Sequence, residues 1–356
     1  MNLSTTSFAE YLLRWNETDN NRAMPWKGEK DPYKIWLSEI ILQQTRVEQG
    51  LQYYLRFIEN FPTVKHLATA EEQMVYKLWE GLGYYTRCKN MIAAARFIQT
   101  ELNGRFPVTY DAIRKLKGVG PYTAAAIASF AFNLPFAVLD GNVFRVLSRY
   151  FGIQTPADTT AGRKEFSDLA QKLIPVASPG KYNQAIMDFG AMVCKPRQPA
   201  CESCIFSASC FAYKNSMTGL LPVKSKQTKI RNRWFNYFIF EYEGQVYLRK
   251  RPANDIWENL YEYWLIETES ETGPEKITTH PDLALILKNQ NAVIEVFPDT
   301  FRQQLSHRRI YARFIRIKLS EPPLLSSEWK ACQPSGIKDL AFPKIINQFH
   351  QAFCSF

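Results

Sequence analysis

Four cysteines stand close together between residues 194 and 210, with the spacing C-x6-C-x2-C-x5-C. Four thiolates in one short loop can wrap a single site, and both a zinc ion and a [4Fe–4S] cluster accept four cysteines. In a reducing compartment, clustered cysteines are more often ligands than disulfide partners. The spacing alone leaves open zinc, an iron–sulfur cluster and unligated thiols. The residues concerned are Cys194, Cys201, Cys204 and Cys210.

Two carboxyl groups, those of Glu39 and Asp140, lie in sequence surroundings that suit either a catalytic or a structural role. Glu39 lies in WLSEIILQQT, a helical stretch that is apolar around it, and burial there would raise its pKa and keep it protonated. Asp140 lies in LDGNVFRVL, between an apolar run and a predicted helix. The alternatives are a solvent-facing Glu39 and an Asp140 that only caps its helix.

A Gly-Val-Gly turn joins two predicted helices in LKGVGPYTAAAI. Gly118 and Gly120 permit backbone conformations that other residues avoid, and Pro121 suits the first position of the second helix. The free N–H groups and the dipole at that helix start attract an anion such as a DNA phosphate. The alternative is an ordinary turn between two helices.

Length, charge and hydropathy narrow the class of protein. The chain has 356 residues, 46% of them hydrophobic, and a formal net charge of +10. The basic surplus suits a polyanion such as nucleic acid, or else is merely a solvated basic surface. We find no secretory signal and no apolar run approaching the roughly 18 residues of a bilayer span. We therefore expect a monomeric cytoplasmic chain, nucleoid-associated in a bacterium, with no membrane partner.

Helical periodicity dominates the first part of the chain. Apolar residues recur at three- and four-residue steps through residues 34–61 until Pro62 stops the pattern, and similar stretches follow to about residue 213. Further on, WFNYFIFEYEGQVYLRKRP predicts a β-hairpin around Glu243 and Gly244, and IYARFIRIKL predicts another strand.

A polar, basic stretch lies between the part with helical periodicity and the part with strand patterns, and its composition is typical of a linker. We therefore expect an all-α domain over residues 1–215, a linker over 216–232 and an α/β domain over 233–356.

The order of these motifs resembles the endonuclease III superfamily of DNA glycosylases. More narrowly, PWKGEKDPYKIWLSEIILQQTRV, LWEGLGYYTRCKNM, LDGNV and YNQAIMDFGAMVC look like the MutY-type adenine DNA glycosylases. The resemblance implies a multidomain fold: an all-α helix-hairpin-helix glycosylase domain with an iron–sulfur cluster loop, then a Nudix-like α/β domain. It also implies a [4Fe–4S] cluster on the four cysteines and a double-stranded DNA substrate with adenine opposite 8-oxoguanine or guanine.

The resemblance also implies the catalytic roles. Glu39 would protonate adenine at N7 and later activate water, while Asp140 would stabilise the sugar cation or attack transiently, with Asn142 supporting the pocket. Bifunctional relatives carry a nucleophilic lysine where this chain has Tyr122. Because an imine cannot form without an amine, we expect a monofunctional hydrolase.

The target adenine must leave the duplex to be cleaved. By resemblance, a wedge beside the orphan base would be formed by Gln43, Gln44 and Tyr84. The resemblance also assigns Trp26, Leu42 and Gln184 to the adenine pocket. The side-chain amide of Gln184 suits paired hydrogen bonds with adenine.

The second domain begins with a strand, an Arg-Pro and an aromatic loop that resemble the opening of a Nudix fold. The hydrolase box G-x5-E-x7-R-E-x2-E-E-x-G is absent from the sequence, so diphosphate hydrolysis is not expected. The recognition loop of the family usually reads Phe-Ser-His. Here it reads Leu305, Ser306 and His307; the serine and histidine would contact 8-oxoguanine, and the leucine weakens stacking.

Three other functions remain as alternatives at this point. They are a glycosylase with lyase activity on oxidised pyrimidines, a non-catalytic DNA-binding or iron–sulfur protein, and a nucleotide hydrolase. The lyase is disfavoured because the lysine is missing, and a non-catalytic protein is disfavoured because both acids are retained. A nucleotide hydrolase is disfavoured because the hydrolase box is missing.

Overall fold

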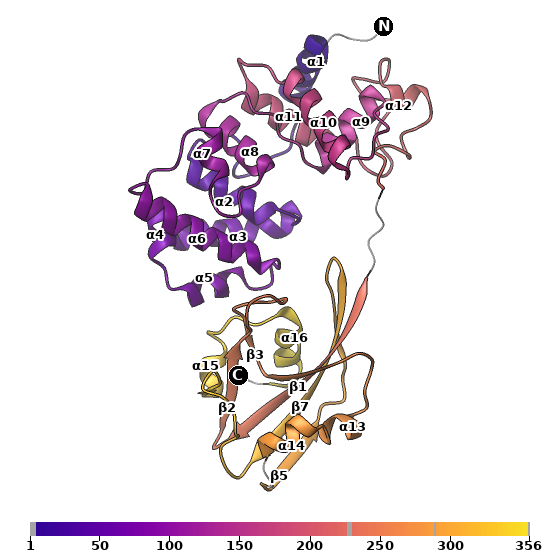
Figure 1. Cartoon of the computed structure of the whole chain (residues 1–356). Coiled ribbons are helices and arrows are strands. Elements are labelled where there is room, and N and C mark those ends of the chain that lie inside the picture. Colours follow the sequence, from indigo (N-terminus) through magenta and orange to yellow (C-terminus); the bar gives the residue numbers. More distant parts are fainter. Residues whose placement is uncertain (1–4, 226–229, 288–289, 355–356) are drawn as a thin grey trace. The chain divides into compact units, whose positions relative to one another are not determined.

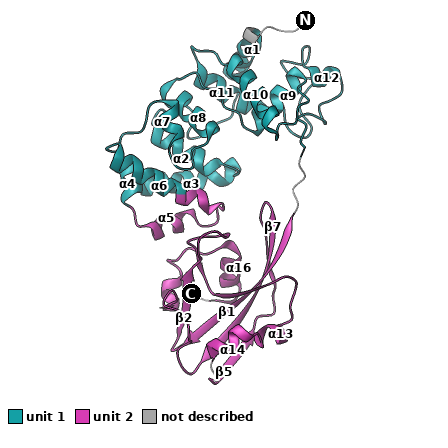
Figure 2. Ribbon diagram, viewed as in Figure 1, with its two compact units in different colours: residues 1–69, 90–227 teal, residues 70–89, 228–356 magenta. Residues whose placement is uncertain are grey.

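The computed structural model describes residues 5–225, 230–287 and 290–354. The chain divides into two compact units (Figure 2). We call residues 1–69 and 90–227 the helical unit, and residues 70–89 and 228–356 the sheet unit.

The helical unit is built from helices that follow one another closely along the chain (Figure 1). Its core gathers the apolar faces of the first helix and of the helices after residue 140, with Phe8, Leu12 and Phe166 fully buried. The described helices are α1 (Thr5–Thr18), α2 (Pro32–Leu42), α3 (Val47–Asn60), α4 (Val64–Thr69), α6 (Tyr85–Glu101), which starts in the sheet unit, α7 (Tyr110–Arg114), α8 (Pro121–Phe132), α9 (Gly141–Phe151), α10 (Thr160–Leu173), α11 (Pro179–Met192) and α12 (Phe211–Lys214).

The helical pattern over residues 34–61 is interrupted in the structure. Helix α2 ends at Leu42 and α3 begins at Val47. Between them Gln44 has a φ of 57°, a left-handed conformation that is uncommon for a residue with a side chain. Side-chain periodicity continues across this turn, so the pattern alone does not reveal the break.

The turn before α8 uses one glycine for its conformation. Gly118 has a φ of +81°, and an added Cβ would lie 2.7 Å from the Cβ of Asn90. Gly120 caps α8 with an ordinary φ of −88°, followed by Pro121 in the first turn. The expectation of a special backbone conformation therefore holds for Gly118 and is wrong for Gly120, because the reversal is completed at the first glycine.

The sheet unit contains a mixed sheet with the order β3-β2-β1-β7-β5. Its central strand β1 pairs in parallel with β7 and antiparallel with β2. The strands are β1 (Arg231–Tyr242), β2 (Gln245–Lys250), β3 (Tyr261–Glu262), β4 (Trp264–Thr268), β5 (Ala292–Val296), β6 (Phe301–Gln304), β7 (Arg308–Leu319) and β8 (Lys330–Cys332), and the helices are α5 (Glu72–Trp79), α13 (Pro274–Thr278), α14 (Pro281–Leu287), α15 (Pro334–Ile337) and α16 (Lys344–Phe353).

Two strand predictions are confirmed. Glu243 and Gly244 form the turn between β1 and β2, with φ values of 48° and 71°, as a tight hairpin requires. The alternating stretch that begins at Ile310 lies within β7. On the sheet, the ring of Phe314 stacks on Phe349 of α16 with centroids 4.0 Å apart.

The structure divides the chain differently from the expected domains 1–215 and 233–356. Residues 70–89 group with the C-terminal part, and β1 begins at Arg231, inside the expected linker 216–232. In the same stretch Leu221 is buried, and its carbonyl accepts a hydrogen bond from Arg149 Nε at 3.1 Å. Among the described residues, none of the helices combines the length and apolar character of a membrane span.

Candidate active site

A cavity of about 980 Å³ opens within the helical unit. Its walls come from α2, from the starts of α8 and α9, and from α11, together with the segment before α2. The cavity brings together most of the residues predicted for catalysis, adenine binding and phosphate binding: Trp26, Glu39, Leu42, Gln43, Gln44, Gly118, Gly120, Tyr122, Asp140, Asn142 and Gln184.

The side chain of Glu39 is almost completely shielded from solvent. Eight of the eleven residues of α2 are buried, and Glu39 itself is 9% exposed. Burial raises the pKa of Glu39 to about 7; a hydrogen bond with Tyr122 opposes this rise, and the nearby charge of Asp140 adds to it. The carboxyl group can therefore carry a proton near neutral pH.

Asp140 caps α9 and lines the same cavity. Its Oδ1 accepts a hydrogen bond from the backbone N–H of Val143, and its Oδ2 accepts one from Nδ2 of Asn142, both at 2.8 Å. Burial raises the pKa of Asp140, although these hydrogen bonds favour the charged form. Asp140 can cap α9 and act in the cavity at the same time, because the capping hydrogen bonds fix a carboxylate that lines the same cavity as Glu39.

Arg145 sets the orientation of the Asn142 amide. Its Nη2 donates to Oδ1 of Asn142 and to the carbonyl of Gly190, both at 2.7 Å, and its Nε donates to the carbonyl of Cys194 at 2.7 Å. Since a guanidinium only donates, the amide oxygen must face Arg145 and the amide N–H must face Asp140. The position of Arg145 in LDGNVFRVL gave no signal that this arginine would be buried.

A fully buried carboxylate on α11, Asp188, was not among the predicted site residues. Asp188 lies one turn after Gln184 and accepts from Nη1 of Arg22 at 2.9 Å and from Nδ2 of Asn20 at 2.9 Å, with Lys27 Nζ at 3.4 Å. These contacts tie the segment that carries Trp26 to α11. An acid inside the apolar stretch AIMDFGAM is the same signal that singled out Glu39.

The residues predicted to form one wedge line two pockets. Gln43 and Gln44 line the cavity of the helical unit, where Gln43 Nε2 donates to Thr123 Oγ1 at 3.1 Å. Tyr84 belongs to the sheet unit and lines a pocket of about 530 Å³ there, together with Leu305, Ser306 and His307.

Tyr84 and Ser306 are joined directly through their hydroxyl groups. Tyr84 is 44% exposed and has a φ of 51°. Left-handed residues with side chains are concentrated at functional positions, where the surrounding structure holds them in place. Residues 305–307 form a tight turn between β6 and β7, closed by a hydrogen bond from Leu305 N to Arg308 O at 2.8 Å.

The four clustered cysteines surround one small pocket that is otherwise lined mainly by apolar and aromatic side chains. None of the seven cysteines, all of them among the described residues, forms a disulfide bond. Arg149 Nη1 donates to Sγ of Cys194 at 3.5 Å, and Phe206 N donates to Sγ of Cys204 at 3.4 Å. Within the described residues, no group of three or more Cys, His, Asp or Glu has the arrangement of a metal-ion site. The sulfur donors and the N–H groups around them fit a thiolate-bound group.

Comparisons with known sequences match both parts of the chain. Residues 37–173 match the HhH-GPD superfamily of base excision DNA repair proteins, and residues 236–352 match the NUDIX domain family. The chain is 33% identical to the adenine DNA glycosylase of Buchnera aphidicola subsp. Baizongia pistaciae, over 92% of this chain and 91% of that protein. It is 39% identical to the human adenine DNA glycosylase, over 58% of this chain and 39% of that one.

Two solved structures match about three fifths of this chain. A thermostable thymine-DNA glycosylase matches with a TM-score of 0.55 and 31% identity, over 59% of this chain and 97% of that chain. An endonuclease III in a trapped covalent complex with DNA matches with a TM-score of 0.52 and 21% identity, over 60% and 99% of the two chains. The second likeness is one of fold.

Proposed function

Because this chain belongs to the MutY-type adenine DNA glycosylases, we propose that it removes adenine lying opposite 8-oxoguanine or guanine. The chain is a DNA glycosylase of base excision repair that releases adenine from DNA. The choice of the opposite base is our proposal. The observation that carries it is the pocket of the sheet unit, where Tyr84, Ser306 and His307 converge.

The release of adenine begins with a proton. Glu39, partly protonated near pH 7 because burial raises its pKa to about 7, donates its proton to N7 while the C1′–N9 bond breaks and the electron pair leaves with the base. The resulting carboxylate then accepts a proton from the water that attacks C1′. The hydroxyl of Tyr122 bonds to Glu39 and orients the carboxyl group.

The sugar left behind carries positive charge. We propose that the Asp140 carboxylate, fixed by Val143 N–H and Asn142 Nδ2, stabilises this oxocarbenium ion. The cavity also contains Trp26, Leu42 and Gln184, which support the binding of a flipped adenine. Position 122 offers a phenol and no amine, and Lys27 is paired with the buried Asp188, which supports hydrolysis without an imine.

The rate of adenine release should fall as the pH rises through about 7. The pKa of Glu39 is raised to about 7, so the protonated acid predominates below that pH and is lost above it. We expect a single-turnover rate that is level at mildly acidic pH and declines by about tenfold per pH unit well above 7. A rate that stays constant from pH 6 to 9 would remove Glu39 as the proton donor.

We propose that Ser306 and His307 read the base opposite adenine, with Tyr84 beside them. The supporting evidence is the Tyr84–Ser306 hydroxyl contact and the exposure of both loop residues. Leu305 is half-buried and supplies packing rather than an aromatic ring to stack.

Ser306→Ala should narrow the preference for 8-oxoguanine over guanine by about tenfold, since one directional hydrogen bond is removed. The measurement compares excision from duplexes with adenine opposite 8-oxoguanine, guanine or thymine, each followed by alkali cleavage. Ser327→Ala, an exposed serine outside the pocket, serves as the control. Unchanged discrimination in Ser306→Ala would contradict the proposed role of the loop.

We also propose that Cys194, Cys201, Cys204 and Cys210 hold a [4Fe–4S] cluster. Its part would be to order the loop between α11 and α12, and no step of the reaction passes through it. Freshly purified protein should contain about four irons per chain and absorb broadly in the blue, and removal of the iron should lower the unfolding temperature. Stoichiometric zinc without iron would contradict the assignment.

A further inference from the structure

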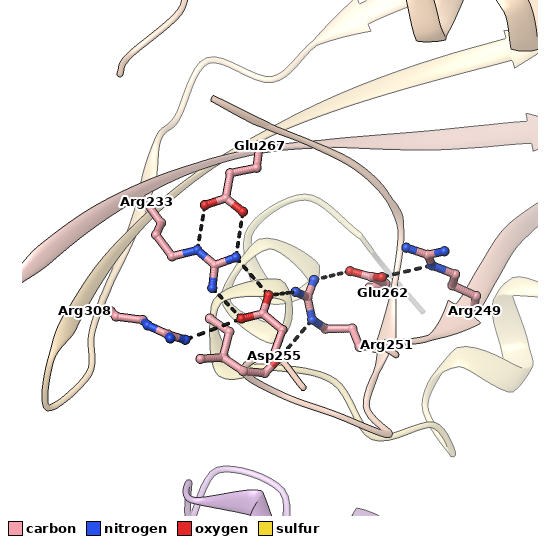
Figure 3. A network of polar contacts seen from close by, with 8 residues as sticks. Arg233, Arg249, Arg251, Asp255, Glu262, Glu267 and Arg308 are labelled. Carbon is pink, nitrogen blue, oxygen red and sulfur yellow. Dashed lines mark hydrogen bonds and ion pairs between the residues drawn. The ribbon is translucent and has the colours of Figure 1, made fainter. Parts of the chain in front are cut away.

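A network of ion pairs crosses the sheet unit (Figure 3). Two of its members, Asp255 and Arg308, line the pocket that also contains Ser306. Arginines and carboxylates alternate along the network, and its members come from five strands (β1, β2, β3, β4 and β7) and from the loop after β2. They are Arg233, Arg249, Arg251, Asp255, Glu262, Glu267 and Arg308.

Asp255 is the centre of this network. Its carboxylate accepts from Nη1 and Nη2 of Arg233 at 2.6 and 2.8 Å, from Nη2 of Arg251 at 2.8 Å, and from Nη1 of Arg308 at 3.4 Å. Burial alone would raise the pKa of Asp255, but the arginines outweigh it and lower this pKa to about 2. Three cations from three chain segments therefore meet on one carboxylate that stays charged.

The contact with Arg308 reaches the recognition loop. Arg308 follows His307 directly, and its carbonyl closes the turn by accepting from Leu305 N. Asp255 and its three successors line the same pocket as Leu305 to Arg308. The Asp255–Arg308 pair thus connects two segments that line this pocket.

The segment that carries Asp255 is also bound on its other side. Glu258 pairs with Lys89, and Asn259 Nδ2 donates to the hydroxyl of Tyr76 at 3.0 Å. Both of these contacts join it to residues 70–89, which include Tyr84. The loop after β2 therefore links Tyr84's segment to the recognition loop within the sheet unit.

One residue of this loop has an unfavourable backbone conformation. Trp257 has a φ of 63°, in the left-handed region that disfavours bulky side chains, whereas Asn254 and Asn259, with φ values of 72° and 68°, are of a type that tolerates this region. Such conformations persist only where surrounding contacts enforce them. Here Arg251 Nε donates to Ile256 O at 3.0 Å, and Arg251 N donates to Leu260 O at 2.8 Å.

We propose that Asp255 is a positioning residue for the discrimination of the base opposite adenine. It anchors Arg308, and through it the loop of Ser306 and His307, against the segment of residues 255–258. The inference rests on the proposed function of that loop. If the Asp255–Arg308 pair were purely structural, its removal would change the stability of the fold and leave the preference between opposite bases unchanged.

Asp255→Asn tests this with a side chain of the same shape and no charge. The ratio of single-turnover excision opposite 8-oxoguanine to that opposite guanine should fall by about tenfold. Glu267→Gln, which removes another acceptor of Arg233 but does not line the pocket, should leave the ratio unchanged. Asp255→Glu should restore part of it.

Arg308→Met provides a second route if Asp255→Asn folds poorly, because it leaves Asp255 paired with Arg233 and Arg251. It should narrow the ratio to a similar degree, and the double variant should be no worse than either single one. A ratio preserved in both single variants overturns the inference. If Ser306→Ala narrows the ratio while Asp255→Asn and Arg308→Met preserve it, only the role inferred for Asp255 fails. If Ser306→Ala also preserves the ratio, the function proposed for the loop fails as well.

Discussion

Glu39→Gln should reduce adenine release by at least about 1,000-fold while duplex binding stays within a few-fold of the parent. The amide keeps the size of the side chain and can still bond to the hydroxyl of Tyr122, but it has no proton of suitable acidity to give. Because the same carboxylate would later accept a proton from water, both halves of the reaction are affected. Single-turnover excision and equilibrium binding to an adenine mispair separate the two quantities.

Folding is the quantity to control in this experiment. The pKa of Glu39 is raised in the folded state, so the protein loses stability as pH rises from the unfolded value of about 4.5 towards 7. Glu39→Gln removes that loss and should unfold at a temperature no lower than the parent at pH 8. Glu48→Gln on α3, exposed and outside the cavity, should keep full activity. Loss of DNA binding in Glu39→Gln would make Glu39 a structural residue.

Asp140→Asn should lower excision by about 100- to 1,000-fold. Asparagine caps helices as well as aspartate does, so its oxygen can still accept from Val143 N–H, and α9 should begin where it does now. What disappears is the negative charge beside the developing sugar cation, together with the oxygen that accepts from Asn142 Nδ2. The single-turnover rate measures this loss, and a circular dichroism melt verifies the cap.

Asp31→Asn supplies a matched comparison for that variant. Asp31 caps α2 by accepting from Tyr33 N at 2.9 Å and lies outside the cavity, so the same change of cap and charge occurs away from the sugar. Its excision rate should equal that of the parent. Equal, small losses in both variants would mean that Asp140 contributes through its cap alone.

Features with a local cause could be read from the sequence. The cap at Asp140, the proline at the start of α8 and the turn at Glu243 and Gly244 depend on residues within a few positions of each other. Glu39 stood out because its neighbours along α2 are apolar, and an acid among them must be buried or exceptional. The family resemblance added the roles of these residues, which spacing and hydropathy do not provide.

Contacts between distant segments could not be read in that way. The Tyr84–Ser306 pair spans 222 positions, the Arg22–Asp188 pair 166 and the Arg308–Asp255 pair 53. Nothing near Tyr84 in the chain indicates that it belongs with the C-terminal loop rather than with Gln43 and Gln44.

The sequence by itself determined that a helical part precedes a part with strands, which acids lie in apolar surroundings and which cysteines can share a ligand. Only the tertiary structure decided that Glu39 and Asp140 line one cavity, that Tyr84 lines another, and that Asp255 gathers three arginines. The physical reason is that hydropathy, caps and turns arise from neighbours along the chain, whereas the burial and pairing of a charge depend on which segments pack against it.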